Sequence, residues 1–234
     1  MSRSDASTAE SGHWRPGSRV ARLRNSHSYV SVLLLIMASF VYTAASPDRH
    51  WSQGVLTLIQ CATFVLALYT AGLGHDFRPG LILVATSLAL AVVAPIVGGD
   101  TLVGVLGIVQ VTLVAATVAV IGLGVFDQGQ VNQQSVTGSI CIYILVGMLF
   151  TFVYGAVAAL DSGPFFAQNT DGTPSLRLYF SYVTLATLGY GDYTAASTLG
   201  HTLSILEALT GQLYLVTVVA VLVAGLAGRR STPA

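Results

Sequence analysis

The chain has 234 residues, of which 53% are hydrophobic and only 9% charged, and its ten arginines balance ten acidic residues. Soluble domains carry about 25% charged residues, so this composition excludes an ordinary soluble protein. The zero net charge excludes a broad basic surface for nucleic acid, and the apolar surroundings of Cys61 and Cys141 exclude a disulfide-stapled secreted fold. The remaining class is an integral membrane protein.

Residues 1–28 are polar and contain five arginines, which predicts a disordered basic tail on the cytoplasmic side. An apolar run over 29–45 follows. It is longer than the roughly 7–15 apolar residues of a signal peptide, so we favour a retained membrane helix over a cleaved leader.

Six apolar runs are the candidate membrane spans: 29–45, 55–72, 81–97, 102–125, 140–160 and 201–226. The first four lie in uncharged stretches that exceed the roughly 20 residues needed to cross a bilayer as a helix. Continuous runs without alternation favour helices over barrel strands, so we expect an all-α protein with six transmembrane helices.

The polar segment 127–137 predicts a cytoplasmic linker between two units. Residues 29–126 before it form the expected four-helix N-terminal domain. Residues 138–228 after it form a helix, a re-entrant segment and a second helix, and 229–234 are a short C-terminal tail.

Arginine placement predicts the orientation. If the N-terminus is inside, eight of the ten arginines lie on the inner side, and only Arg49 and Arg177 lie outside. We therefore expect a multi-pass protein of the cell membrane with both termini cytoplasmic and the connection 161–198 facing outward.

That outer connection contains the signals of a short helix. Thr173 is a plausible N-cap and Pro174 suits the first helical position. A helix over 174–186 would be about 20 Å long, which is less than a full crossing. Its C-terminal end would direct a partial negative charge into the membrane and favour a cation there.

The sequence Thr187-Leu188-Gly189-Tyr190-Gly191-Asp192 follows directly. It resembles the TxGYGD selectivity-filter signature of potassium channels, and five fixed residues arise by chance in a chain of this size about once in ten thousand cases. The resemblance extends over about 140–226 and names its parts: outer helix, pore helix, filter and inner helix. The chain departs from many relatives at Ala186, where they carry threonine, and over 193–195, where they carry proline.

The resemblance implies a role for each residue of this segment. Backbone carbonyls of Thr187, Leu188, Gly189 and Tyr190 would replace the hydration shell of K⁺, with the Thr187 hydroxyl at the inner end and Asp192 at the outer mouth. Gly189 and Gly191 tolerate the unusual dihedrals that inward carbonyls require. The filter would be supported by pore-helix residues, and Tyr190 would pack against the aromatic ones; these residues are Tyr179, Phe180, Tyr182 and Thr184.

Two residues of the last apolar run are candidates for gating. Gly211 occupies the position of the family's hinge glycine, although close helix packing explains a glycine there equally well. Glu207 is the only acidic or basic residue in the interior of a span, since the histidines lie at span edges. It is either a gating or proton-sensing acid or a structural hydrogen-bonding group.

The first four helices resemble a voltage-sensor domain in number only. Residues 102–125 contain no arginine or lysine. One charge crossing the membrane contributes only about 2.3 kcal/mol per 100 mV, so steep voltage gating by this helix is excluded.

These observations predict a potassium-selective channel subunit that conducts K⁺ passively, without a cofactor, and no sequence motif of an enzyme occurs. One chain supplies one filter loop, so we expect a homotetramer in membrane lipid, with K⁺ as its permeant partner. A non-selective cation channel, a non-conducting subunit with a pore-like loop, and a potassium transporter subunit are the alternatives.

Overall fold

The computed structural model describes residues 29–45, 50–72, 78–97, 100–127 and 132–230. Over these residues the elements are α2 (Tyr29–Ala45), α3 (His50–Ala71), α4 (Arg78–Val97), α5 (Asp100–Asp127), α6 (Gln133–Leu160), α7 (Pro174–Leu185) and α8 (Thr198–Arg230). In this described part, extended pairing is limited to two isolated bridges at Phe166. The expectation of an all-α protein is therefore confirmed.

Four of the described helices contain a segment long and apolar enough to cross a membrane: Ser52–Ala71, Gly104–Phe126, Gln133–Leu160 and Thr198–Val221. The apolar segments Tyr29–Ala45 and Arg78–Val93 are shorter than 18 residues. The chain is thus a multi-pass membrane protein.

Two helices extend past the expected boundaries. Helix α6 begins at Gln133, inside the linker expected over 127–137. The reason is a capping box, in which the Asn132 side chain accepts from the Ser135 amide at 2.8 Å and so supports the first turn. At the other end, α8 continues to Arg230 and includes the first residues of the expected tail. The tail expected over 1–28 lies outside the described residues.

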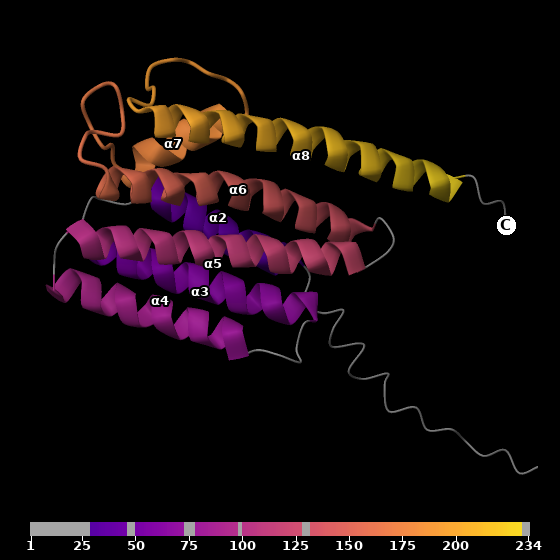
Figure 1. The fold of residues 1–234 in the computed structure, drawn as a ribbon. Helices are drawn as coiled ribbons and strands as arrows, with labels where there is room; N and C mark the ends of the chain where they lie inside the picture. Colours follow the sequence, from indigo (N-terminus) through magenta and orange to yellow (C-terminus); the bar gives the residue numbers. More distant parts are fainter. Residues whose placement is uncertain (1–28, 46–49, 73–77, 98–99, 128–131, 231–234) are drawn as a thin grey trace, which may run out of the picture.

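Helix α6 is the central element and packs against α2, α5, α7 and α8. Figure 1 shows α8, in yellow, along one side of the group of helices and α4 on the opposite side. Small residues bring α5 and α6 together: a Cβ on Gly107 would lie 3.3 Å from the Ala156 Cβ. Such close approach of backbones is the usual mode of helix association in membranes.

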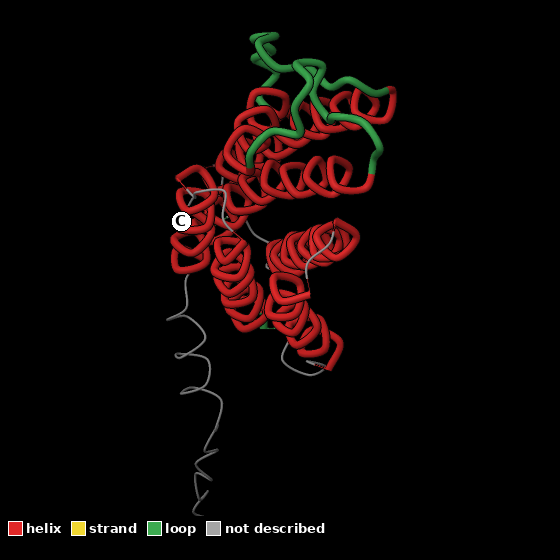
Figure 2. Tube along the Cα trace, turned by 90° about the vertical axis from the view of Figure 1, so that its left-hand side faces the viewer, coloured by secondary structure: helices red, strands yellow, loops and turns green. Residues whose placement is uncertain are grey.

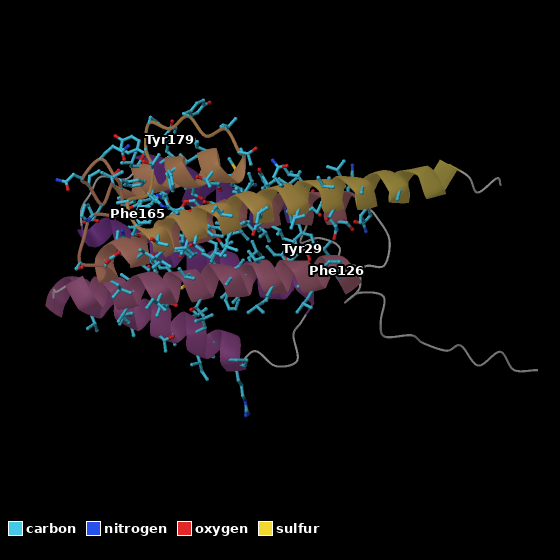
Figure 3. All side chains as sticks on the ribbon, turned by 45° about the horizontal axis from the view of Figure 1, so that its top comes forward. Tyr29, Phe126, Phe165 and Tyr179 are labelled. Atoms are coloured by element: carbon cyan, nitrogen blue, oxygen red, sulfur yellow. The ribbon has the colours of Figure 1, made fainter. Side chains whose placement is uncertain are left out.

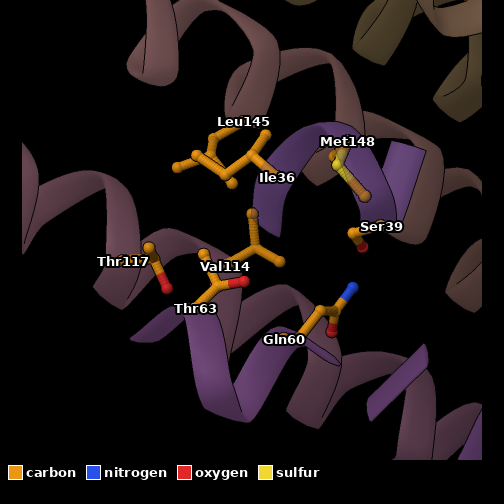
Figure 4. A pocket seen from close by; sticks show the side chains of 8 residues that line it. All are labelled: Ile36, Ser39, Gln60, Thr63, Val114, Thr117, Leu145 and Met148. Atoms are coloured by element: carbon orange, nitrogen blue, oxygen red, sulfur yellow. The ribbon is translucent and has the colours of Figure 1, made fainter. Parts of the chain in front are cut away.

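A cavity of about 10 Å³ lies between α6 and three N-terminal helices. Its lining residues, drawn in Figure 4, are Ile36, Ser39, Gln60, Thr63, Val114, Thr117, Leu145 and Met148. The Gln60 amide and the Ser39 hydroxyl are buried, and within the described ranges neither has a hydrogen-bond partner. Because buried polar groups are normally paired, this junction between the N-terminal helices and α6 carries an energetic cost.

The long connections before and after α7 gather at one end of the helices, as the green loops in Figure 2 show. Figure 3 labels Tyr179 and Phe165 at this end and Tyr29 and Phe126 toward the opposite end. The two connections are joined by backbone hydrogen bonds from Ala167 to Thr194 (2.9 Å) and from Ala196 to Phe165 (2.8 Å). The segment that resembles a filter therefore lies in a connection that is hydrogen-bonded, just after this segment, to the connection before α7.

Candidate functional site

Helix α7 begins as the sequence predicts and leads directly into residues 187–192, which we call the filter segment. The Thr173 hydroxyl accepts from the Leu176 amide at 3.1 Å, and Pro174 is the first helical residue. The helix has 12 residues and ends at Leu185, one residue before the expected end. It is about 18 Å long, too short to cross a bilayer.

The φ angle alternates in sign along the backbone of the filter segment. The φ angles of Thr187, Gly189 and Gly191 are +56°, +54° and +75°, whereas Leu188 and Tyr190 between them have negative φ. An extended strand points successive carbonyls to opposite sides. A φ that alternates in sign turns successive peptide units so that their carbonyls can face one side, as a ring of cation ligands requires.

Glycine is needed in this segment for its backbone and not for space. An added Cβ at Gly189 or Gly191 would meet no atom within 4 Å, but an L-residue at these φ values is strained. Thr187 adopts such a φ without being glycine, so the surrounding structure must hold it there.

Hydrogen bonds from two helices hold the start of the filter segment. The Thr187 amide donates to the Thr184 carbonyl at 2.9 Å, and the Leu188 amide donates to the Val183 carbonyl at 2.9 Å. From α8, the Gln212 amide group donates to the Thr187 hydroxyl at 3.0 Å. The base of the segment is therefore tied to both α7 and α8.

The outer end of the filter segment is held by Asp192. Its carboxylate accepts from the Tyr179 hydroxyl at 2.8 Å, and this bond raises the pKa of Tyr179 above its usual value. Its carbonyl accepts from the Gln168 side chain at 3.0 Å. The rings of Tyr179 and Tyr190 stack at 6.5 Å with an interplanar angle of 10°. The C-terminal end of the filter segment is thus linked to the exposed side of α7.

Within one chain, Phe180 and Tyr182 do not join this stack; the expected packing of Tyr190 against all three aromatic residues stays a prediction. The Phe180 ring packs in a buried cluster with Phe166, at a centroid distance of 5.2 Å. The Tyr182 ring contacts Phe40 of α2 edge-on, at 5.1 Å. Tyr179 and Phe180 are adjacent in α7 and therefore point in different directions. Tyr182 lies one turn from Tyr179 but packs on Phe40 of α2 instead.

Gly211 lies against the end of α7. A Cβ there would collide with the Leu185 carbonyl oxygen and lie 2.9 Å from its Cδ1 atom. Helix α8 is continuous through this position. The geometry therefore provides a packing reason for glycine.

Glu207 is fully buried, one turn before Gly211. Its carboxyl contacts the hydroxyls of Tyr154 on α6 and Ser181 on α7. The two gating candidates of the sequence thus both lie where α8 meets the pore helix.

Sequence reasoning missed several residues of this site: Gln168, Gln212, Ser181, Tyr154 and Phe40. A polar side chain inside an apolar run was an available signal for Gln212. No local signal distinguishes Phe40 from the other apolar residues of α2, because its partner lies 142 positions later in the sequence, at Tyr182.

A comparison with protein families matches residues 140–227 to a family described as ion channel. The matched range includes most of α6, all of α7 and the filter segment, and most of α8. Searches of curated proteins and of solved structures found no match. Residues 140–227 are therefore an ion channel pore domain in a multi-pass membrane protein, and the chain is not an enzyme.

Proposed function

We propose that the chain is a subunit of a potassium-selective channel whose filter is formed by residues 187–191. The observation that carries the proposal is the alternation of positive and negative φ along these residues, directly after a short helix. A desolvated K⁺ ion needs several oxygen ligands in place of its hydration shell, and stacked rings of backbone carbonyls supply them.

The proposed ligands are the carbonyls of Thr187, Leu188, Gly189 and Tyr190. Two further features favour a cation here. The C-terminal end of α7, with its partial negative charge, leads into the filter segment. At the outer end, Asp192 adds a full negative charge.

A filter ring requires four copies of the segment, and each chain has one, so the channel is a homotetramer with cyclic symmetry. Burial within one chain supports this. Only 11% of the apolar segment of α8 is buried, against 50% for α6. The filter segment is exposed as well. In the tetramer, α8 and the filter segments face the central axis.

All six long helices cross the membrane in this proposal. The 17 residues of α2 are about 25 Å long, which is at the lower limit for a crossing. The bias of arginines supports an orientation with both termini in the cytoplasm and the filter segment near the outer surface.

Reconstitution of the purified chain in planar bilayers, with K⁺ on one side and Na⁺ on the other, tests the proposal. The reversal potential is expected to follow the K⁺ gradient. A reversal potential that follows Na⁺ equally would identify a non-selective cation channel, and absence of current would support a non-conducting subunit. Tyr190→Ala should reduce selectivity, whereas Phe126→Ala, at an 85% exposed site on α5, should leave it unchanged.

A further inference from the structure

Glu207 connects three helices through its buried carboxyl group. Tyr154 of α6 donates its hydroxyl proton to one carboxyl oxygen. The other carboxyl oxygen lies 2.5 Å from the Ser181 hydroxyl oxygen of α7. All three residues are fully buried in the chain.

The Ser181 hydroxyl has a second contact, which decides where its proton lies. Its oxygen is 2.6 Å from the Gly147 carbonyl oxygen of α6. A carbonyl can only accept, and two oxygens approach this closely only with a proton between them. The single proton of Ser181 is therefore directed to Gly147.

The contact between Ser181 and Glu207 then needs a proton from elsewhere. An ionised Glu207 would leave two protons, those of Tyr154 and Ser181, for three oxygen–oxygen contacts. A protonated Glu207 supplies the third proton, and every contact becomes a hydrogen bond. Of the two forms, only the protonated acid supplies a proton to each of these three contacts.

The surroundings agree with a neutral group. Other titratable groups near the carboxyl are tyrosines: Tyr143 and Tyr154 on α6 and Tyr182 on α7. A carboxylate at membrane depth would be costly without a basic partner.

We infer that Glu207 works as an uncharged carboxylic acid and is a positioning residue for the pore helix. It accepts from Tyr154, donates to Ser181, and thereby fixes α7 relative to α6 and α8. The consequence for conduction rests on the proposed function, because Ser181 lies two residues before Val183, whose carbonyl binds the Leu188 amide of the filter segment. A displaced α7 would displace that segment.

Two substitutions at Glu207 distinguish a protonated Glu207 from an ionised one. In Glu207→Gln the amide can accept from Tyr154 and donate to Ser181, so it reproduces the bonds of a protonated acid. Glu207→Met fills a similar volume, leaves the Tyr154 hydroxyl without its acceptor and removes the group that donates to Ser181. We expect K⁺ current and melting temperature near wild type for Gln, and a loss of current of about tenfold or more for Met.

Infrared difference spectroscopy of wild type against Glu207→Gln at neutral pH measures the protonation state without any need for conduction. The expected result is a carbonyl band of a protonated carboxylic acid that is present in wild type and absent in the variant. A carboxylate band in its place, or a Gln variant as defective as Met, would overturn the inference. A channel that proves non-selective would refute the proposed function and leave the infrared result standing.

Discussion

Replacing Gly211 by alanine adds a single methyl group where α8 meets the end of α7. The new Cβ would collide with the Leu185 carbonyl oxygen and lie 2.9 Å from Leu185 Cδ1. The Cδ1 atom can rotate away, but a backbone carbonyl at the end of a helix cannot. Helix α8 must therefore move away from α7 by several tenths of an ångström.

The size of the effect follows from two contributions. Overpacking of this kind costs about 1–3 kcal/mol. The shift also lengthens the 3.0 Å bond between Gln212, the next residue of α8, and the Thr187 hydroxyl. Loss of that bond adds about 1 kcal/mol. The total destabilisation is about 2–4 kcal/mol per chain.

Thermal unfolding in detergent and bilayer currents measure this effect. Gly122→Ala is the matched control, because it lies in α5 and its Cβ would meet no atom within 4 Å. We expect Gly211→Ala to lower the melting temperature and the current, and Gly122→Ala to lower neither. A Gly211→Ala protein as stable as wild type, with only its opening impaired, would refute the packing argument and favour a hinge.

Three further substitutions test other parts of the chain. Gly189→Ala should abolish selective conduction, because alanine at φ +54° costs about 1–2 kcal/mol in each chain. The control is Gly163→Ala, where an added Cβ also meets no atom within 4 Å but φ is not positive, and this variant should conduct normally. Equal behaviour of the two variants would contradict the backbone argument. Tyr179→Phe keeps the ring and removes the hydrogen bond to Asp192. It should weaken discrimination of K⁺ from Na⁺, measured as reversal potential, and an unchanged value would show that the bond is irrelevant to the filter. Gln60→Met should raise stability by about 1–3 kcal/mol, because it removes a buried amide without a partner, and a lower melting temperature would count against this.

Local sequence patterns predicted much of the architecture. Uncharged apolar runs predicted the positions of the long helices, because one backbone buried in lipid must satisfy its own hydrogen bonds. Thr173 and Pro174 predicted where α7 begins, since capping depends on a few adjacent side chains. The end of the linker was missed because Asn132 was read as polar loop and not as a cap.

The directions of side chains were predictable only in part. Tyr179, Phe180 and Tyr182 were all expected near Tyr190, but only Tyr179 stacks on it. A resemblance identifies which residues surround a filter, while helical geometry and the neighbouring helices decide which of them face it. Phe40 of α2 receives Tyr182, and this contact depends on how α2 packs against α7.

The sequence by itself determined that this is a helical membrane protein with one short glycine-containing segment suited to a cation. The reason is that composition, the length of an apolar run and the backbone freedom of glycine are properties of adjacent residues. Only the tertiary structure decided what Gly211 and Glu207 contact. Tyr154 lies 53 positions before Glu207 and Ser181 lies 26 before it. Contacts over such separations arise when helices pack, and they determine which groups lie within hydrogen-bonding distance and where an added methyl group would collide.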